Sequence, residues 1–167
     1  MAFDTIVNWK HADEMTDMTL DDRVRRLEDL LAIQQLFIDY GEHLDAGDFA
    51  AYAQLFAEDG EVLLGPMGRA TGRAEIQELM TRTLADRVGT TFHIVTSPRV
   101  ALDGDRATST VMWTVVGTGE ADALAVPMVG HHLDDLVRTP DGWRFQRRRG
   151  VMNLPSTFRG PTAPKGE

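Results

Sequence analysis

Five histidines and the acidic side chains near them carry most of the acid–base chemistry open to this chain of 167 residues. A neutral imidazole accepts protons near neutral pH, and a carboxylate beside it fixes its tautomer and stabilises the imidazolium. His131 and His132 are adjacent, and Asp134 follows two residues later. On a strand, His132 and Asp134 share one face and His131 takes the other. We therefore expect one histidine to face a cavity, with a surface or sheet-stabilising role as the alternative for His132 and Asp134.

The spacing of the other residues does not indicate a metal site or a covalent nucleophile. His43 and Asp45 are two residues apart on a predicted helix, where side chains diverge, and no two-histidine-one-carboxylate spacing occurs. The chain contains no cysteine, which excludes disulfides, thiolate metal sites and a cysteine nucleophile. The GxSxG turn of serine hydrolases is also absent from the sequence. We expect no bound metal.

The charge balance argues against nucleic acid and anionic membranes as partners. The formal net charge is −9, which repels phosphate groups. The main basic cluster, Arg144 and residues 147–149, is divided, because strand alternation puts Arg147 and Arg149 on one face and Arg148 on the other. No apolar run reaches the ~20 residues of a membrane span, and the N-terminus does not read as a signal peptide. We expect a cytoplasmic protein.

Helices are predicted in the first half of the chain. From Asp21, apolar residues recur at three- and four-residue steps for about 25 residues, which is typical of a long amphipathic helix. Thr19 or Asp21 is its expected N-cap. A second, short helix follows Asp48 with apolar residues at helical spacing as far as Phe56, and a third opens at Gly72 and runs to Leu84. Between them, we expect a turn at Asp59-Gly60 and a short strand over 61–64.

Beyond Gly89 the hydrophobic period changes from helical to two, which indicates strands. Turn signals, including Asp-Gly steps, separate four such stretches: 92–101, 107–116, 127–138 and 143–152. Helices followed by a four-strand meander predict an α+β domain with an antiparallel sheet. The predicted organisation is an N-terminal arm (1–19), one domain (20–154) and a flexible tail (155–167).

This order of elements resembles the SnoaL-like branch of the nuclear transport factor 2-like superfamily, which includes scytalone dehydratase, bile acid 7α-dehydratase and hexachlorocyclohexane dehydrochlorinase. The likeness spans about residues 22–153, and four segments carry it: LAIQQLFIDYGEHLDAGDFAAYAQLFAEDGEV, GRATGRAEI, TTFHIVTSPRVALDGDRATS and GHHLDDLVRTPDGWRFQRR. The resemblance implies a cone-shaped α+β barrel in which three N-terminal helices pack on a strongly curved sheet. It also implies an apolar cavity open at one end. Some relatives only bind or scaffold, so the fold does not name the reaction.

The resemblance assigns catalytic roles to three residues. Asp45, at the end of the long helix, and His93, near the start of the first long strand, match the Asp–His pair of the dehydratase and dehydrochlorinase relatives. Tyr40 matches the tyrosine of the bile acid dehydratase. In these roles His93 removes a proton from carbon, Asp45 orients His93, and Tyr40 donates to the developing oxyanion or departing hydroxyl. Such chemistry needs no cofactor.

Structural readings of the same residues stay open. Asp45 is followed by Ala-Gly-Asp, so its carboxylate is also suited to capping a turn or the next helix. His93 on a strand is often an ordinary core or edge histidine. Gly41, one turn before Asp45, leaves space either for a ligand or an approaching strand, or simply packs.

A hydrophobic ligand is expected between the helices and the sheet. Trp113, Met128 and Phe56, together with His132 and Asp134, are the predicted substrate-binding residues. Methionine adapts to irregular ligands, which favours a flat polycyclic ketone or steroid. The remaining expected lining residues are Phe37, Met80, Phe92, Met112 and Met152. The loop over 117–125 is long for a hairpin and is a candidate gate.

Two functions follow from these observations. The first is a cofactor-independent lyase or isomerase, dehydratase-like, that acts on a small hydrophobic polycyclic or aromatic hydroxy or keto compound. The second is a non-catalytic ligand-binding or assembly module of the same fold. Under either reading, the resemblance implies a homodimer or higher oligomer formed through the open face of the sheet.

Overall fold

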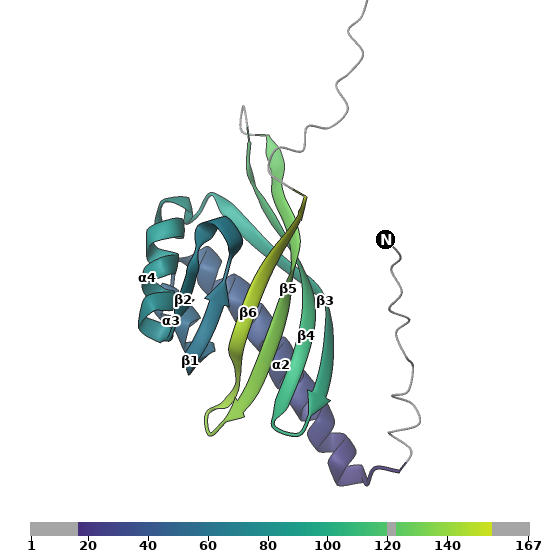
Figure 1. The fold of residues 1–167 in the computed structure, drawn as a ribbon. Helices are drawn as coiled ribbons and strands as arrows, with labels where there is room; N and C mark the ends of the chain where they lie inside the picture. Colours follow the sequence, from purple (N-terminus) through teal and green to yellow (C-terminus); the bar gives the residue numbers. More distant parts are fainter. Residues whose placement is uncertain (1–16, 120–122, 155–167) are drawn as a thin grey trace, which may run out of the picture.

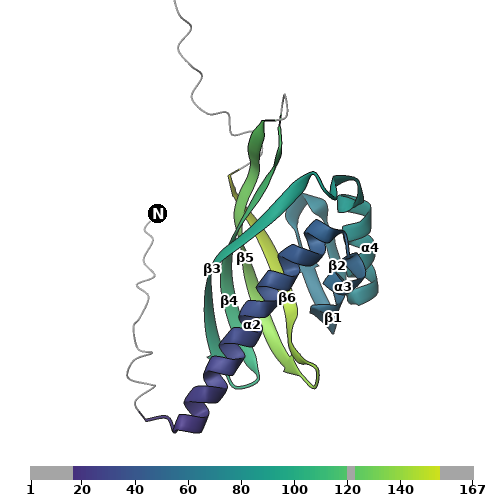
Figure 2. The ribbon, with the colours of Figure 1, turned by 180° about the vertical axis from the view of Figure 1, so that it is seen from behind.

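Three helices pack against one face of a curved six-stranded sheet (Figure 1). The computed structural model describes residues 17–119 and 123–154. Most of the predicted arm and the whole predicted tail lie outside these residues. The long helix α2 crosses the sheet diagonally, and Figure 2 shows it from the side that it covers. The helices are α2 (Leu20–Ala46), α3 (Phe49–Gln54) and α4 (Arg73–Leu84), with short 3₁₀ turns at η1 (Gly65–Met67) and η2 (Ala85–Arg87).

The sheet is mixed, with strand order β2-β1-β6-β5-β4-β3. The expected meander is present and antiparallel, but β1 pairs with β6 in parallel, a contact that local sequence signals do not specify. The short strand β2 is antiparallel to β1 and was not predicted. The strands are β1 (Phe56–Leu63), β2 (Arg69–Thr71), β3 (Thr91–Asp103), β4 (Arg106–Thr118), β5 (Leu124–Thr139) and β6 (Gly142–Leu154).

Helix α2 begins and ends with strong local signals. The Thr19 hydroxyl accepts a hydrogen bond from the backbone N–H of Asp22, and Gly47 ends the helix in the left-handed conformation with φ of 71°. In the second half the predicted apolar stripe is buried, as at Leu36, Phe37, Tyr40 and Leu44. In the first half, three residues of that stripe are exposed: Val24, Leu27 and Leu31. This end projects beyond the sheet (Figure 1).

Strand β1 differs from the prediction at its start. Phe56 was expected in the second helix and Asp59-Gly60 in a turn, yet all three belong to β1. The pairing register of β1 with β6 shifts between Phe56 and Glu61, so the turn-like residues form an irregularity within the strand. A Cβ at Gly60 would lie 2.9 Å from the carbonyl oxygen of Phe145, which explains why glycine is needed there.

Register shifts curve the sheet around the core. They occur between β3 and β4, β4 and β5, and β5 and β6, and such bulges increase local twist. Strand β4 continues to Thr118 and β5 begins at Leu124, so the described part of the 117–125 segment is mostly strand rather than loop. Residues 120–122 of the expected gate lie outside the described residues. No helix among those described is long and apolar enough to cross a membrane.

Candidate active site

Asp45 and His93 are in direct contact. Asp45 lies in the last turn of α2 and His93 near the start of β3, and the His93 Nδ1 is 2.6 Å from Asp45 Oδ1. The same carboxylate accepts the backbone N–H of His93 at 3.0 and 3.1 Å. Because an ionised carboxylate only accepts, Nδ1 carries the proton and Nε2 presents its lone pair on the other side of the ring. Both side chains are about 15% exposed, which leaves the pair accessible.

Strand β3 lies close to α2 at Gly41. A Cβ built on Gly41 would be 3.5 Å from the carbonyl oxygen of His93 and 3.8 Å from a methyl group of Val95. These are ordinary contact distances, so Gly41 marks the place where the strand crosses the helix. The helix one turn further on then presents Asp45 to the backbone and the ring of His93.

Tyr40 and His132 form a second polar group. The Tyr40 hydroxyl is 3.4 Å from His132 Nε2, and the two rings meet edge to face with centroids 5.1 Å apart. Burial raises the pKa of Tyr40, although nearby Arg148 acts in the opposite direction, so Tyr40 keeps its proton. Burial and the positive charge of Arg148 lower the pKa of His132 well below its ordinary value. Tyr40 and His132 are therefore both neutral.

An apolar cavity of about 400 Å³ connects these groups. Tyr40, His93 and His132 are its titratable lining residues among those described. Trp113 and Met128, two of the residues predicted to bind substrate, also line it. The rest of the lining is apolar or glycine: Leu44, Leu64, Gly65, Pro66, Met67, Met80, Leu84, Val115, Gly150 and Met152. The cavity is suited to a hydrophobic ligand with few polar groups.

Asp134 lies behind this cavity in a buried ion pair. Its two carboxylate oxygens accept hydrogen bonds from Arg148 at 2.7 and 2.9 Å, and Ser109 donates to one of them at 2.7 Å. The side chains of Asp134 and Arg148 are fully buried. The guanidinium of Arg148 also stacks on the ring of Tyr40, 4.3 Å from its centroid. Asp134 thus supports the wall of the cavity through Arg148 and Tyr40.

Other predicted ligand-contacting residues lie elsewhere. Phe56 is fully buried in the core, where its ring packs against Tyr52 and Phe145. Phe92 and Met112 are more than half exposed, because strand alternation places them on the face of the sheet opposite the helices. In the described ranges, 17–119 and 123–154, no three His, Asp or Glu side chains gather into a metal-binding group.

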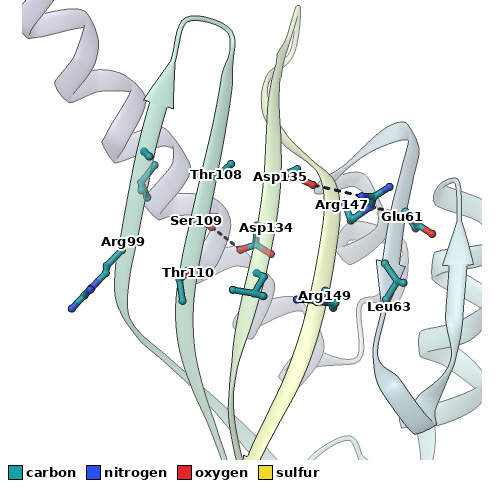
Figure 3. Close-up of a pocket in the computed structure, with 13 residues that line it drawn as sticks. Glu61, Leu63, Arg99, Thr108, Ser109, Thr110, Asp134, Asp135, Arg147 and Arg149 are labelled. Atoms are coloured by element: carbon teal, nitrogen blue, oxygen red, sulfur yellow. Dashed lines mark hydrogen bonds and ion pairs between the residues drawn. The ribbon is translucent and has the colours of Figure 1, made fainter. Parts of the chain in front are cut away.

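The opposite face of the sheet carries a broader and more open hollow (Figure 3). Arg147 pairs there with Glu61 at 2.8 Å, Arg149 lies two positions further along β6, and Arg99 lies across the hollow on β3. Ser109 and Asp134 turn to the other side of the sheet, toward α2, as alternation requires. The expected division of the arginine cluster is confirmed, since Arg148 is buried whereas Arg147 is exposed.

The amino-acid sequence of this domain matches a known family model. Residues 25–149 match the model of the SnoaL-like domain. The chain belongs to this family. An uncharacterized protein of Mycobacterium tuberculosis (strain ATCC 25618 / H37Rv) is 32% identical to this SnoaL-like domain over 127 residues, which covers 75% of this chain and 86% of that protein. The family and the fold expected from the sequence are therefore confirmed.

Solved structures agree on the fold. An NTF2-like protein with a cystatin-like fold from Novosphingobium aromaticivorans is 31% identical, with a TM-score of 0.72, covering 80% of this chain and 88% of that one. The hexachlorocyclohexane dehydrochlorinase LinA-type3 from Novosphingobium barchaimii LL02 is 20% identical, with a TM-score of 0.69, over 79% of this chain and 91% of that chain. At that identity the likeness concerns the fold alone.

Arg148 is the main site residue that sequence reasoning did not identify. Alternation separates Arg148 from Arg147 and Arg149 but does not say which face is covered, and nothing local sets the β5–β6 register that pairs Asp134 with Arg148. The segment from Leu64 to Met67 was also missed as cavity lining. Its signal was weak, because Gly-Pro after a strand indicates a turn and gives no direction to the side chains.

Proposed function

We propose that this SnoaL-like protein is a cofactor-independent lyase or isomerase that acts on a small hydrophobic hydroxy or keto compound, aromatic or polycyclic. The observation that carries the proposal is the 2.6 Å contact of Asp45 with His93 at the wall of an apolar cavity. The contact leaves Nε2 of His93 as the basic nitrogen of the ring. A carboxylate that orients a neutral imidazole is the arrangement that general base catalysis needs.

In the proposed reaction, Nε2 of His93 removes a proton from a carbon next to a carbonyl group. The C–H electrons form a C=C bond, and the carbonyl electrons move to the oxygen, which receives a hydrogen bond from the Tyr40 hydroxyl. Asp45 stabilises the imidazolium throughout. Return of the proton to a different carbon completes an isomerisation. Expulsion of a β-hydroxyl that takes the proton, and so leaves as water, completes a dehydration.

Proton removal is measurable without knowing the natural substrate. We expect the protein to accelerate deuterium incorporation next to the carbonyl of a bound bicyclic or polycyclic ketone in D₂O, followed by NMR. Ligands are first selected by thermal shift from a panel that begins with 1-tetralone. His93→Ala removes the base and should lower the catalysed exchange by roughly 10²–10⁴-fold.

The matched control is His131→Ala, because His131 contacts Asn153 and is not among the residues that line the cavity. It should keep the wild-type exchange rate. Undiminished exchange in His93→Ala would overturn the proposal. Binding of ketones without any exchange in the wild type would favour the ligand-binding module instead.

The exposed face of the sheet supports a homodimer as a second part of the proposal. Three apolar side chains are exposed on it to 59%, 40% and 51%: Phe92, Ile94 and Met112. The hollow on the same face is lined by both basic and acidic side chains, among them Arg149 and Asp135, so the face is suited to pairing with a second copy of itself. Sedimentation should give twice the 18.5 kDa monomer mass, and Met112→Lys should lower it to the monomer.

A further inference from the structure

Among the described residues, His132 is the cavity-lining imidazole that the proposed reaction does not use. It projects from β5 toward Tyr40 of α2, 3% exposed, and its Nε2 is the hydrogen-bonding neighbour of the Tyr40 hydroxyl. The ring is packed closely. Trp113 lies 5.7 Å away between centroids, and the position of a Cβ on Gly150 would be 3.8 Å from Nε2. The His132 distance is an ordinary contact, whereas Leu64 Cδ2 would lie only 3.2 Å from the same Cβ.

The protonation of His132 decides which way the hydrogen bond runs. Its pKa is lowered by burial and by Arg148, so the ring is neutral and carries one proton. Nδ1 is buried and finds no hydrogen-bond partner in the part of the chain that the structure describes. An orphaned buried N–H is rarer in proteins than an unused acceptor, so the proton belongs on Nε2. Nε2–H then donates to the Tyr40 oxygen.

This direction matters for Tyr40. A hydroxyl that accepts from Nε2–H keeps its own O–H for another acceptor, and both residues line the cavity. If the hydrogen bond ran the other way, the Tyr40 O–H would donate to His132 and would not be available to a ligand. At 3.4 Å the contact is longer than a strong hydrogen bond, so it has room to shorten when a ligand oxygen takes the Tyr40 proton.

The charges behind this pair are compensated. Arg148 stacks on Tyr40, but both of its hydrogen bonds go to the carboxylate of Asp134. Its Nη1 finds no hydrogen-bond partner among the described residues, but the fully buried Arg148 is not among the residues that line the cavity. A carboxylate ligand would therefore lose its hydration without gaining a hydrogen bond from this guanidinium, whose charge Asp134 already balances. An uncharged oxygen, such as that of a ketone, needs only the Tyr40 hydroxyl.

We propose that His132 is a positioning residue that donates Nε2–H to Tyr40 and so directs the Tyr40 hydroxyl at an uncharged acceptor oxygen of the ligand. The inference rests on the proposed function, since it names the ligand group that Tyr40 receives. It adds a residue whose effect passes through Tyr40 and not through His93.

The test compares 1-tetralone with tetralin, its hydrocarbon analogue, by calorimetric titration. The ratio of their dissociation constants measures the oxygen-dependent part of binding. Loss of one neutral hydrogen bond, worth about 1 kcal/mol, should lower the ratio roughly fivefold in Tyr40→Phe. His132→Leu should lower it by a similar factor. The double variant should lower the ratio no further, because each change removes the hydrogen bond from the Tyr40 hydroxyl to the ketone oxygen.

His132→Gln is the conservative variant, since an amide N–H can also donate to the Tyr40 oxygen. It should recover most of the ratio. An unchanged ratio in His132→Leu, or additive losses in the double variant, would overturn the inference. In the unmodified protein, ¹⁵N NMR should find the proton of His132 on Nε2, and a proton on Nδ1 would equally contradict the inference. That measurement decides the question even if His132→Leu does not fold.

Different results would contradict the role of His132 and the role of His93. His93→Ala should abolish deuterium exchange yet keep the preference for the ketone, because His93 contributes no hydrogen bond to the ligand oxygen. Exchange that persists in His93→Ala with the preference intact removes the proposed role of His93 alone. If deuterium exchange depends on His93 but the preference for the ketone is unchanged in His132→Leu, only the proposed role of His132 is wrong.

Discussion

Two carboxylates pair with basic groups, one at the wall of the cavity and one behind it, and the pairs differ in which nitrogen atoms remain open to a ligand. Asp134 holds Arg148 by two hydrogen bonds, with Ser109 as a third donor, and the pair is fully buried. Asp45 holds His93 through Nδ1 and the backbone N–H, but leaves the second ring nitrogen for the cavity. Each pair has a similar short contact, of 2.6 to 2.7 Å.

The difference indicates where stability and where chemistry reside. A fully buried ion pair that does not line the cavity cannot act on a ligand there, and breaking it leaves an uncompensated charge in the core. The Asp45–His93 pair keeps one ring nitrogen of His93 free, so it can transfer a proton. Because this pair is partly exposed to solvent, a substitution in it should cost less stability than one in the fully buried pair. Short distances alone would not separate these two roles.

The largest effect is expected for the buried pair. Asp134→Ala leaves the Arg148 charge unpaired in the core and should lower the free energy of unfolding by about 3–5 kcal/mol. The matched control is Asp135→Ala at the next position, where the side chain is 56% exposed and pairs only distantly with Arg147. That change should stay within about 0.5 kcal/mol. Urea denaturation measures both, and equal losses would contradict the comparison.

A smaller effect is expected for the neutral His132 beside the buried pair. Its pKa in the folded state is well below the ordinary 6.5. At mildly acidic pH, the unfolded chain therefore binds a proton on His132 that the folded chain does not bind. Stability should then fall as the pH drops below about 6.5, by at most about 1.4 kcal/mol per pH unit from this residue.

His132→Gln has no such proton to bind and should show a shallower acid-side slope in urea midpoints between pH 7 and 5. His131→Gln should keep the wild-type slope, because His131 is less buried and hydrogen-bonds Asn153. Parallel slopes for wild type and His132→Gln would show that His132 takes up a proton inside the folded protein.

The smallest effect on stability is expected for Asp45→Asn. The amide oxygen can still accept the backbone N–H of His93, so the loss should be about 1 kcal/mol. The amide N–H₂ then faces Nδ1 and forces the His93 proton onto Nε2. ¹⁵N NMR should detect this exchange of tautomer. Asp39→Asn on the same helix should leave it unchanged, since Asp39 bonds only Gln35 among the described residues.

Most of the fold was predictable from local sequence. The Thr19 cap, the helix starts at Asp48 and Gly72, and the change of period after Gly89 predicted three helices and the four-strand meander in the right order. These signals are local, because a cap or a turn depends on a few neighbouring residues. The resemblance to the family then directed attention to Asp45 and His93, which the structure brings into contact.

The remaining features depend on pairing between distant segments. The parallel contact of β1 with β6, and the register that places Asp134 opposite Arg148, have no signature within either strand. Phe56 was misplaced for the same reason, because an apolar residue after a short helix fits either a helix end or a buried strand. The alternation that places Phe92 and Met112 outward was readable, yet which face would be covered was not.

The position of β6 bears on how this protein is made. It is the last strand in chain order, yet it lies between β1 and β5 and joins the helical half to the meander. Arg148 and Gly150, which complete the wall around Tyr40 and His132, are on this strand. A nascent chain that stops before residue 142 thus has every proposed catalytic residue, but it lacks the strand that joins β1 to the meander and completes this wall. Ligand binding should therefore appear late in synthesis and abruptly.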